Sequence, residues 1–278
     1  MSRIQHLSEK EINEIEMKAK KKLGEKFKVN RILRDEVFEL VQQEATLLKY
    51  PIHDNELCAF VCLKENRTFV YINTFIPREK QVFAAAHELY HIWYDKDRLL
   101  EPELLHNDVM DNETENINEQ KANRFAALLL VPTDVLHSEL MSRAIQKDTL
   151  SIEDVIVLMA FFYVPFKTMV RRLNEIDFID QKKTSEFLSV PDRDPQAGVM
   201  LVRKRLQLND SSQERTNEIF FEKLAENAIE AFDKKLISER KLRSILSLMN
   251  QSPESLQVIK GADEVDLDIL LEDYDGNE

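Results

Sequence analysis

The stretch 84–95, "AAAHELYHIWYD", places two histidines and a glutamate in a run that otherwise has the composition of a buried helix. His87 and His91 are four residues apart, so on a helix their side chains differ by roughly 40° in direction and roughly 6 Å along the axis. Both imidazoles can converge on one ion, and the pattern H-E-x-x-H predicts a zinc site with two histidine ligands. Glu88, offset by about 100°, is then placed to act as general base on the attacking water.

The alternative is a chance match, in which ordinary core hydrogen bonds hold the two histidines and Glu88 is exposed. With six histidines in the chain, a random H-E-x-x-H is expected in roughly one such sequence in a hundred. The three alanines that precede His87 also indicate close helix packing, which favours the metal site.

A catalytic zinc ion needs a third protein ligand and an open position for water. The downstream side chains that qualify by type are Glu101, Glu103, His106, Asp108, Glu113, Glu115 and Glu119. A ligand on a rigid helix is held more precisely than one in a loop, which favours Glu119 in the expected helix "EQKANRFAALLL". Glu119 alternatively forms a capping box with Asn116. Asn123, one turn further on the same face, is expected to hydrogen-bond a ligand or the substrate.

The flanking segments predict an α+β fold. Two β-branched and aromatic runs, "ELCAFVCLK" and "TFVYINTFI", are separated by "ENR" and should form a hairpin. A helix should follow from Pro77 through the H-E-x-x-H motif, because proline is common at a helix start. Another is expected from Ser8 to about Lys22, and a further one over 32–48, "ILRDEVFELVQQEATLL".

Residues 151–176, "SIEDVIVLMAFFYVPFKTMVRRLNEI", predict two short helices broken at Val164–Pro165, in the manner of a helix-turn-helix. Lys167, Arg171 and Arg172 on the second helix allow direct DNA binding. Plain helical packing is the favoured interpretation, because the chain carries a net charge of −13.

Five segments are expected along the chain. Residues 1–145 should form the metallopeptidase core, 146–189 the helix-turn-helix-like segment and 190–215 a linker. Residues 216–260 should form a C-terminal helical module, in which Ser238 caps one helix and Ser252-Pro253 opens another. Residues 261–278 form a strongly acidic tail, expected to be disordered at its end.

The composition indicates a cytoplasmic protein without a membrane span. The N-terminus lacks the apolar stretch of a secretory signal. The longest apolar run, 155–166, is shorter than the roughly 20 residues that cross a bilayer. Cys58 and Cys62, four residues apart in an expected strand, are too distant for a disulfide.

Two motifs together carry a family resemblance. Residues 69–94, "FVYINTFIPREKQVFAAAHELYHIWY", and 118–132, "NEQKANRFAALLLVP", resemble the ImmA/IrrE metallopeptidases, which combine a strand ending in Ile-Asn, an H-E-x-x-H helix and E-x-x-A-N-x-F-A-x-x-L-L-x-P. The resemblance implies a zincin-like core in which His87, His91 and Glu119 bind Zn²⁺ and Glu88 is catalytic. Tyr90 stands where the family usually has a small residue, and Lys121 replaces an acidic one. Tyr90 should pack in the core rather than contact substrate.

The resemblance also implies a function. Family members are site-specific endopeptidases that inactivate a helix-turn-helix repressor or antitoxin, often encoded beside them on phages or mobile elements. The residues alone imply metal-assisted peptide hydrolysis, with Zn²⁺ expected although two histidines and a glutamate also accept Mn²⁺, Fe²⁺ or Co²⁺. The substrate is expected to add to the edge of strand "TFVYIN".

Two other functions stay open. The chain could be a non-proteolytic binding protein with a structural metal site, acting through its C-terminal helices. A structural site does not need Glu88, which favours the enzyme. An intermediate possibility is an enzyme that cleaves only when a partner or signal orders the loop 96–116.

Overall fold

The computed structural model describes residues 7–26, 31–96, 99, 106–107, 116–208 and 211–258. The chain divides into two compact units, residues 1–219 and 220–278. We call them the first and second unit and describe each by itself. The five expected domain boundaries remain predictions.

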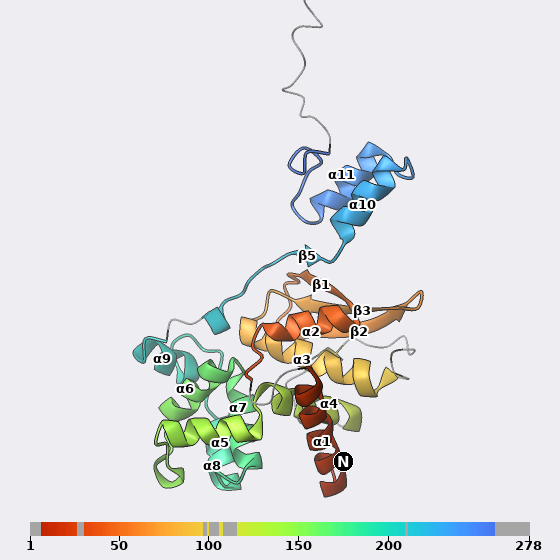
Figure 1. Cartoon of the computed structure of the whole chain (residues 1–278). Coiled ribbons are helices and arrows are strands. Elements are labelled where there is room, and N and C mark those ends of the chain that lie inside the picture. Colours follow the sequence, from red (N-terminus) through yellow and green to blue (C-terminus); the bar gives the residue numbers. More distant parts are fainter. Residues whose placement is uncertain are drawn as a thin grey trace, which may run out of the picture. The chain divides into compact units, whose positions relative to one another are not determined.

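The first unit contains a small mixed sheet (Figure 1). Its strands are β1 (Thr46–Tyr50), β2 (Leu57–Lys64), β3 (Arg67–Asn73) and β4 (His106–Asn107), in the spatial order β4-β2-β3-β1. The antiparallel pair β2–β3 confirms the predicted hairpin. Glu65 and Asn66 in its turn have φ angles of 49° and 60°, because two-residue turns with positive φ match the twist of the strands they join.

Two expectations about this sheet are wrong. Residues 32–48 do not form one helix: α2 ends at Glu44, and β1 begins at Thr46. The strand is favoured there because β1 pairs in parallel with β3 and buries Leu47. That pairing also overturns the second expectation, since β3 has β2 on one side and β1 on the other and offers no edge to a substrate strand.

Asn73 at the end of β3 is fully buried and ties the sheet to the following loops. Its Nδ2 lies 2.8–2.9 Å from the backbone oxygens of Ile52, Asp54 and Leu57. Its Oδ1 accepts from the backbone N–H groups of Ile52 and Phe75 at 2.9 and 3.0 Å. A buried amide with all its groups paired fixes the chain where it leaves the sheet toward the next helix.

Three helices are stacked beneath the sheet, namely α3 (Arg78–Tyr94), α4 (Ile117–Leu130) and α1 (Glu9–Lys26). Helix α3 packs against β2 and β3, α2 (Glu36–Glu44) packs beside α3, and α4 lies on α3 and is covered in turn by α1. Every residue of α3 from Glu79 to Ile92 is buried. Polar side chains on a helix that is enclosed on all sides cost folding free energy unless they have hydrogen-bond partners or bind an ion.

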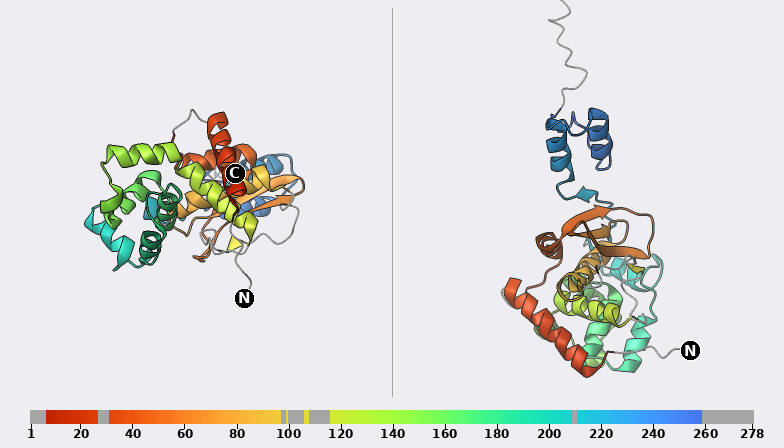
Figure 2. Two further views of the ribbon diagram at one scale, coloured as in Figure 1. Left: turned by 90° about the horizontal axis from the view of Figure 1, so that it is seen from below. Right: turned by 90° about the vertical axis from the view of Figure 1, so that its right-hand side faces the viewer.

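The remaining helices of the first unit gather beside α3 and α4, away from the sheet (Figure 2). They include α5 (Thr133–Ser142), α6 (Ile152–Phe162), α7 (Phe166–Glu175) and α8 (Gln181–Leu188), with the short 3₁₀ helix η2 (Lys147–Thr149). Tyr163, with φ of 62°, ends α6, and Pro165 precedes α7. The expected break between the two helices is confirmed.

Arg172 on α7 packs rather than facing solvent. It is 1% exposed, and its guanidinium donates to the backbone oxygen of Val131 at 3.1 and 3.2 Å and to Thr133 Oγ1 at 2.9 Å. This cation therefore joins α7 to the end of α4. The favoured packing interpretation holds for Arg172.

The stretch 190–215, expected to be a linker, includes helix α9 (Gly198–Arg205) and the 3₁₀ helix η3 (Ser211–Gln213). Helix α9 packs on α6 and buries Val199, which accounts for its order. Gly198 has φ of 55°, and a side chain there would meet the backbone oxygen of Pro191 at 2.0 Å. Only glycine allows this approach.

The second unit has the short strand β5 (Phe220–Phe221) and helices α10 (Leu224–Asp233) and α11 (Glu239–Ser247). Ala228, Leu242 and Leu246 form its core. Ser238 caps α11 as expected, accepting from the backbone N–H of Lys241 at 3.3 Å. Ser252-Pro253 opens turns rather than the expected helix. The acidic tail 261–278 lies outside the described residues.

Among the described helices, none alone is long and apolar enough to cross a membrane. Helices α4 and α5 meet that criterion only as a pair bent by 48°.

Candidate metal centre

The packing of α3 on α4 brings the predicted site residues together. His87, Glu88 and His91 lie on α3, and Glu119 and Asn123 lie on α4. His87 and Glu88 are fully buried, and none of the five is more than 8% exposed. The expectation that Glu88 would be exposed in a chance match is therefore not met.

His87, His91 and Glu119 each point one ligand atom at a common centre, and these atoms lie within 4.8 Å of one another. His87 Nε2 is 3.0 Å from Glu119 Oε2 and 3.2 Å from His91 Nε2, and His91 Nε2 is 3.6 Å from Glu119 Oε1. A tetrahedral ion with bonds of about 2.0–2.1 Å keeps its ligand atoms roughly 3.3 Å apart. The separations, which involve both oxygens of the Glu119 carboxylate, lie on either side of this value, so the residues present fit a zinc-sized ion.

The Nδ1 atom of each histidine points away from the common centre and contacts a hydrogen-bond acceptor. This contact sets the orientation of the ring and so of its Nε2 atom. His87 Nδ1 lies 2.9 Å from Asn123 Oδ1, and His91 Nδ1 lies 3.2 Å from Asp95 Oδ2. Both oxygens accept, so each Nδ1 donates its hydrogen outward and each Nε2 is turned toward the common centre. Two imidazole Nε2 atoms and a carboxylate therefore converge, a donor set that a cation would satisfy.

Asp95 is the functional candidate that sequence reasoning missed. It follows His91 by four residues at the end of α3, a spacing that places two side chains on one helix face. That spacing is the sequence signal that could have identified it. Asn123, by contrast, lies where it was expected, against His87.

His91 and Glu119 shift one another's pKa values in opposite directions. Burial lowers the pKa of His91, but its hydrogen bonds to Asp95 and Glu119 outweigh this effect and raise the pKa to about 9. The negative charge of Glu88 raises the pKa of His91 further. Burial raises the pKa of Glu119, and its hydrogen bonds to the two histidines outweigh this and hold the pKa far below its ordinary value. Glu119 is thus ionised, as a metal ligand must be.

The position of the Glu119 carboxylate distinguishes a metal-ligand role from a capping role. Asn116 caps α4, accepting from the backbone N–H of Asn118 at 3.0 Å, while the carboxylate of Glu119 faces His87. The geometry thus favours the ligand interpretation. The other downstream candidates lie outside the residues or side chains that the structure describes, namely Glu101, Glu103, His106, Asp108, Glu113 and Glu115. Most of the loop 96–116 lies there as well.

The two departures from the family pattern do not belong to the candidate ligand set. Tyr90 is 4% exposed and packs in a cluster with Tyr94 and Phe125, as expected. Lys121 forms an ion pair with Glu11 of α1 at 2.9 Å. Tyr90 also meets the ring of His91 edge-on, with the ring centroids 5.8 Å apart, so it packs against a candidate ligand, whereas Lys121 holds α1.

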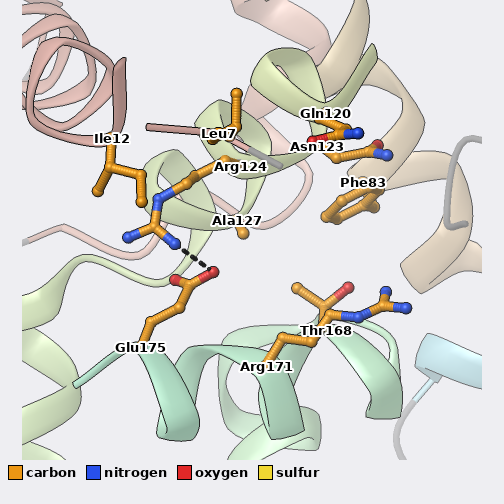
Figure 3. A pocket seen from close by; sticks show the side chains of 10 residues that line it. All are labelled: Leu7, Ile12, Phe83, Gln120, Asn123, Arg124, Ala127, Thr168, Arg171 and Glu175. Atoms are coloured by element: carbon orange, nitrogen blue, oxygen red, sulfur yellow. Dashed lines mark ion pairs between the residues drawn. The ribbon is translucent and has the colours of Figure 1, made fainter. Parts of the chain in front are cut away.

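A cavity of about 240 Å³ adjoins the site between α1, α3, α4 and α7 (Figure 3). Phe83 and Asn123 line one side of it, and Thr168 and Arg171 of α7 line the other. Asn123 also contacts His87, so this cavity reaches the residues that orient the candidate ligands. Arg124 and Glu175 form an ion pair at 2.8 Å at its far end.

The buried His-His-Glu group on an H-E-x-x-H helix is the arrangement of a metallopeptidase. Comparison with protein families agrees: the model of the IrrE N-terminal-like domain, Peptidase_M78, matches residues 39–174. The first unit therefore contains a domain of the Peptidase_M78 family, as the resemblance indicated, and its mixed sheet and helices form the expected α+β core.

Other comparisons add little. A solved structure described as a Mycobacterium tuberculosis transcriptional regulator is 16% identical, with a TM-score of 0.40. The match covers 58% of this chain and 46% of the regulator, which is less than half of that protein's length. No curated protein sequence matches the chain.

Proposed function

We propose that this chain is a zinc-dependent, site-specific endopeptidase. The observation that carries the proposal is the convergence of His87 Nε2, His91 Nε2 and a Glu119 carboxylate oxygen at spacings that fit one tetrahedral ion. Membership of a peptidase family supports the reaction class. Zinc is the proposed ion because two histidines and one glutamate are a ligand set that catalytic zinc sites use.

Each residue of the site would have a distinct task. Bound zinc would polarise the carbonyl of the scissile bond and lower the pKa of water. The Glu88 carboxylate would accept a proton from the attacking water and return it to the nitrogen of the leaving amine. Asn123 and Asp95 would hold the imidazoles by their Nδ1–H groups, so that neither ring turns away.

The proposed substrate is a helix-turn-helix repressor or antitoxin. The ImmA/IrrE resemblance supports this substrate class. Cleavage would inactivate the repressor and derepress its genes. Direct DNA binding by the chain is not needed for this function.

The test is cleavage of a repressor encoded beside this gene, with the wild-type chain and Glu88→Gln compared at equal zinc content. Glu65→Gln, in the exposed hairpin turn, is the matched control. Cleavage at one position by the wild type and the control, with none by Glu88→Gln, would support the proposal. Equal cleavage by Glu88→Gln would contradict the role of Glu88.

Metal bound by all three chains without cleavage of any neighbouring repressor would count against the substrate class. It would favour the alternative, a binding protein with a structural metal site.

A further inference from the structure

A second cavity, of about 260 Å³, lies at the opposite end of α3 from the histidines. The start of α3 and the loop before it form one wall, and the α6–α7 junction, α9 and η3 form the others. Ile76, Met159, Phe166 and Val199 give it an apolar floor. Nothing in the proposed catalytic mechanism uses this cavity.

Lys80 lines the cavity in an unusual state. It is 8% exposed, yet among the described residues no hydrogen bond or ion pair reaches its ammonium group. Burial lowers the pKa of Lys80 and the positive charge of Arg193 lowers it further, while Cys58, Asp192 and Glu79 raise it only in part. A buried lysine without a partner is costly to fold, so such a group points to a ligand that supplies the missing contact.

Gln213 supplies an independent observation from another element. Gln213 also lines this cavity, and its Nε2 is buried and has no hydrogen-bond partner in the described part of the chain. Two donors without such a partner, one on α3 and one on η3, thus belong to residues that line the same space. Both require an acceptor rather than a donor.

The surrounding charges are mixed and help to define the ligand. Arg193 and Arg215 line the cavity together with Asp192 and Glu79. Arg193 is ion-paired with Glu56 at 3.3 Å and Arg215 donates to Asn55 Oδ1 at 3.0 Å, whereas the Lys80 ammonium has neither a hydrogen bond nor an ion pair among the described residues. The N-terminal end of α3, a helix of 17 residues, adds positive partial charge nearby.

We propose that this cavity binds a carboxylate group attached to an apolar body, with Lys80 and Gln213 contacting the carboxylate. A carboxylate accepts from both donors, and its negative charge suits the Lys80 ammonium. The apolar floor would take the rest of the molecule. The carboxylate could belong to a free small molecule or to an acidic side chain of a peptide.

The peptide source rests on the proposed function. Lys80 precedes His87 by seven residues, which places the two on nearly the same face of α3, roughly 10 Å apart along the axis. An extended peptide covers that length in about three residues. The face of α3 between them is buried, so the peptide would run around the helix, with a Glu or Asp at least about three residues from the scissile bond entering this cavity.

The first experiment measures binding independently of cleavage. Hexanoate and 4-phenylbutyrate are titrated by calorimetry beside hexanamide and 4-phenylbutyramide, which keep the body and lose the charge. We expect the carboxylates to bind about tenfold or more tightly than the amides. Lys80→Met should abolish this preference, Gln213→Leu should weaken it, and Lys182→Met on the exposed face of α8 should retain it.

The second experiment distinguishes the two sources. Nine-residue peptides that differ only by Glu or Gln at one position are titrated into the Glu88→Gln variant, which is expected not to cleave them. Preference for Glu at one position, lost in the double variant with Lys80→Met, would show the peptide source. Small carboxylates binding without any such peptide preference would show the free-ligand source.

The proposal is overturned if neither carboxylates nor Glu peptides are preferred, or if Lys80→Met and Gln213→Leu, shown by circular dichroism to be folded, bind as the wild type does. Because these readouts are affinities, a failure here leaves the cleavage assay as a separate test of the endopeptidase.

Discussion

The two ends of α3 bury polar groups in opposite ways. Near its C-terminal end, His87 and His91 each hold an acceptor at Nδ1 and share Glu119 between them. Near its N-terminal end, Lys80 is 8% exposed and has no hydrogen-bond or ion-pair partner in the described part of the chain. One helix thus carries a cluster whose members orient one another and a cation whose ammonium group no acceptor contacts.

The histidine cluster and the Lys80 cavity require ligands of opposite charge. The histidine cluster is already arranged, and adding a cation would complete it without moving its members far. The Lys80 cavity lacks an acceptor, so an anion would complete it. Opposite deficits at the two ends of one helix predict opposite responses to ligands and to substitution.

The largest effect is expected at Glu88. Glu88→Gln keeps the shape of the side chain and removes its ability to take a proton, so kcat/KM for peptide cleavage should fall about 10²- to 10⁴-fold. Metal content, measured by mass spectrometry, should stay at the wild-type level. Loss of metal in Glu88→Gln would show that Glu88 belongs to the ligand set instead.

Arg172 extends the comparison to a buried cation that has partners. Arg172→Met removes its bonds to Val131 and Thr133 and leaves buried acceptors unpaired, so unfolding free energy should fall by about 3 kcal/mol. Urea denaturation of this variant and of exposed Arg205→Met measures the difference. Equal stability of the two variants would refute the importance of this buried pairing.

Asp95 tests how the histidine cluster is oriented. Asp95→Ala removes the acceptor of His91 Nδ1–H, so zinc affinity should fall about 10- to 100-fold. Competition with a chelator of known affinity measures the change, with exposed Asp148→Ala as control. An unchanged affinity in Asp95→Ala would mean that packing alone orients His91.

Lys80 should respond in the opposite sense to Arg172. Replacing a buried, unpartnered ammonium by Met removes its desolvation cost and keeps the length of the chain, so Lys80→Met should gain about 1 kcal/mol in unfolding free energy. Urea denaturation without added carboxylate measures it, beside Lys182→Met. A loss of stability would indicate that Lys80 has a partner in the protein itself.

The sequence predicts local pattern well and tertiary pairing poorly in this chain. The hairpin, α3, α4 and the convergence of His87, His91 and Glu119 follow from spacing and helix geometry. The sequence predicts a helix where β1 lies, because Thr46, Leu47 and Leu48 are compatible with a helix and with a strand. Only the pairing with β3 decides for the strand. The same pairing closes the edge that a substrate was expected to use.

The features that were not predicted depend on contacts between distant segments. The sequence predicts a linker where α9 lies. Helix α9 is ordered by packing on α6 and by the close approach of Gly198 to Pro191, and neither contact is visible in the local sequence. Lys80 and Gln213 are far apart in the sequence, and their shared cavity arises only once η3 lies against α3. Asp95 could have been found from its spacing to His91.

The central claim is that His87, His91 and Glu119 bind one zinc ion, and metal stoichiometry after purification tests it most directly. The wild-type chain and His137→Ala, an exposed histidine on α5, should each carry close to one zinc per chain, while His87→Ala and Glu119→Ala should carry almost none. A wild-type chain without stoichiometric metal, or zinc retained after both ligand substitutions, would contradict the account.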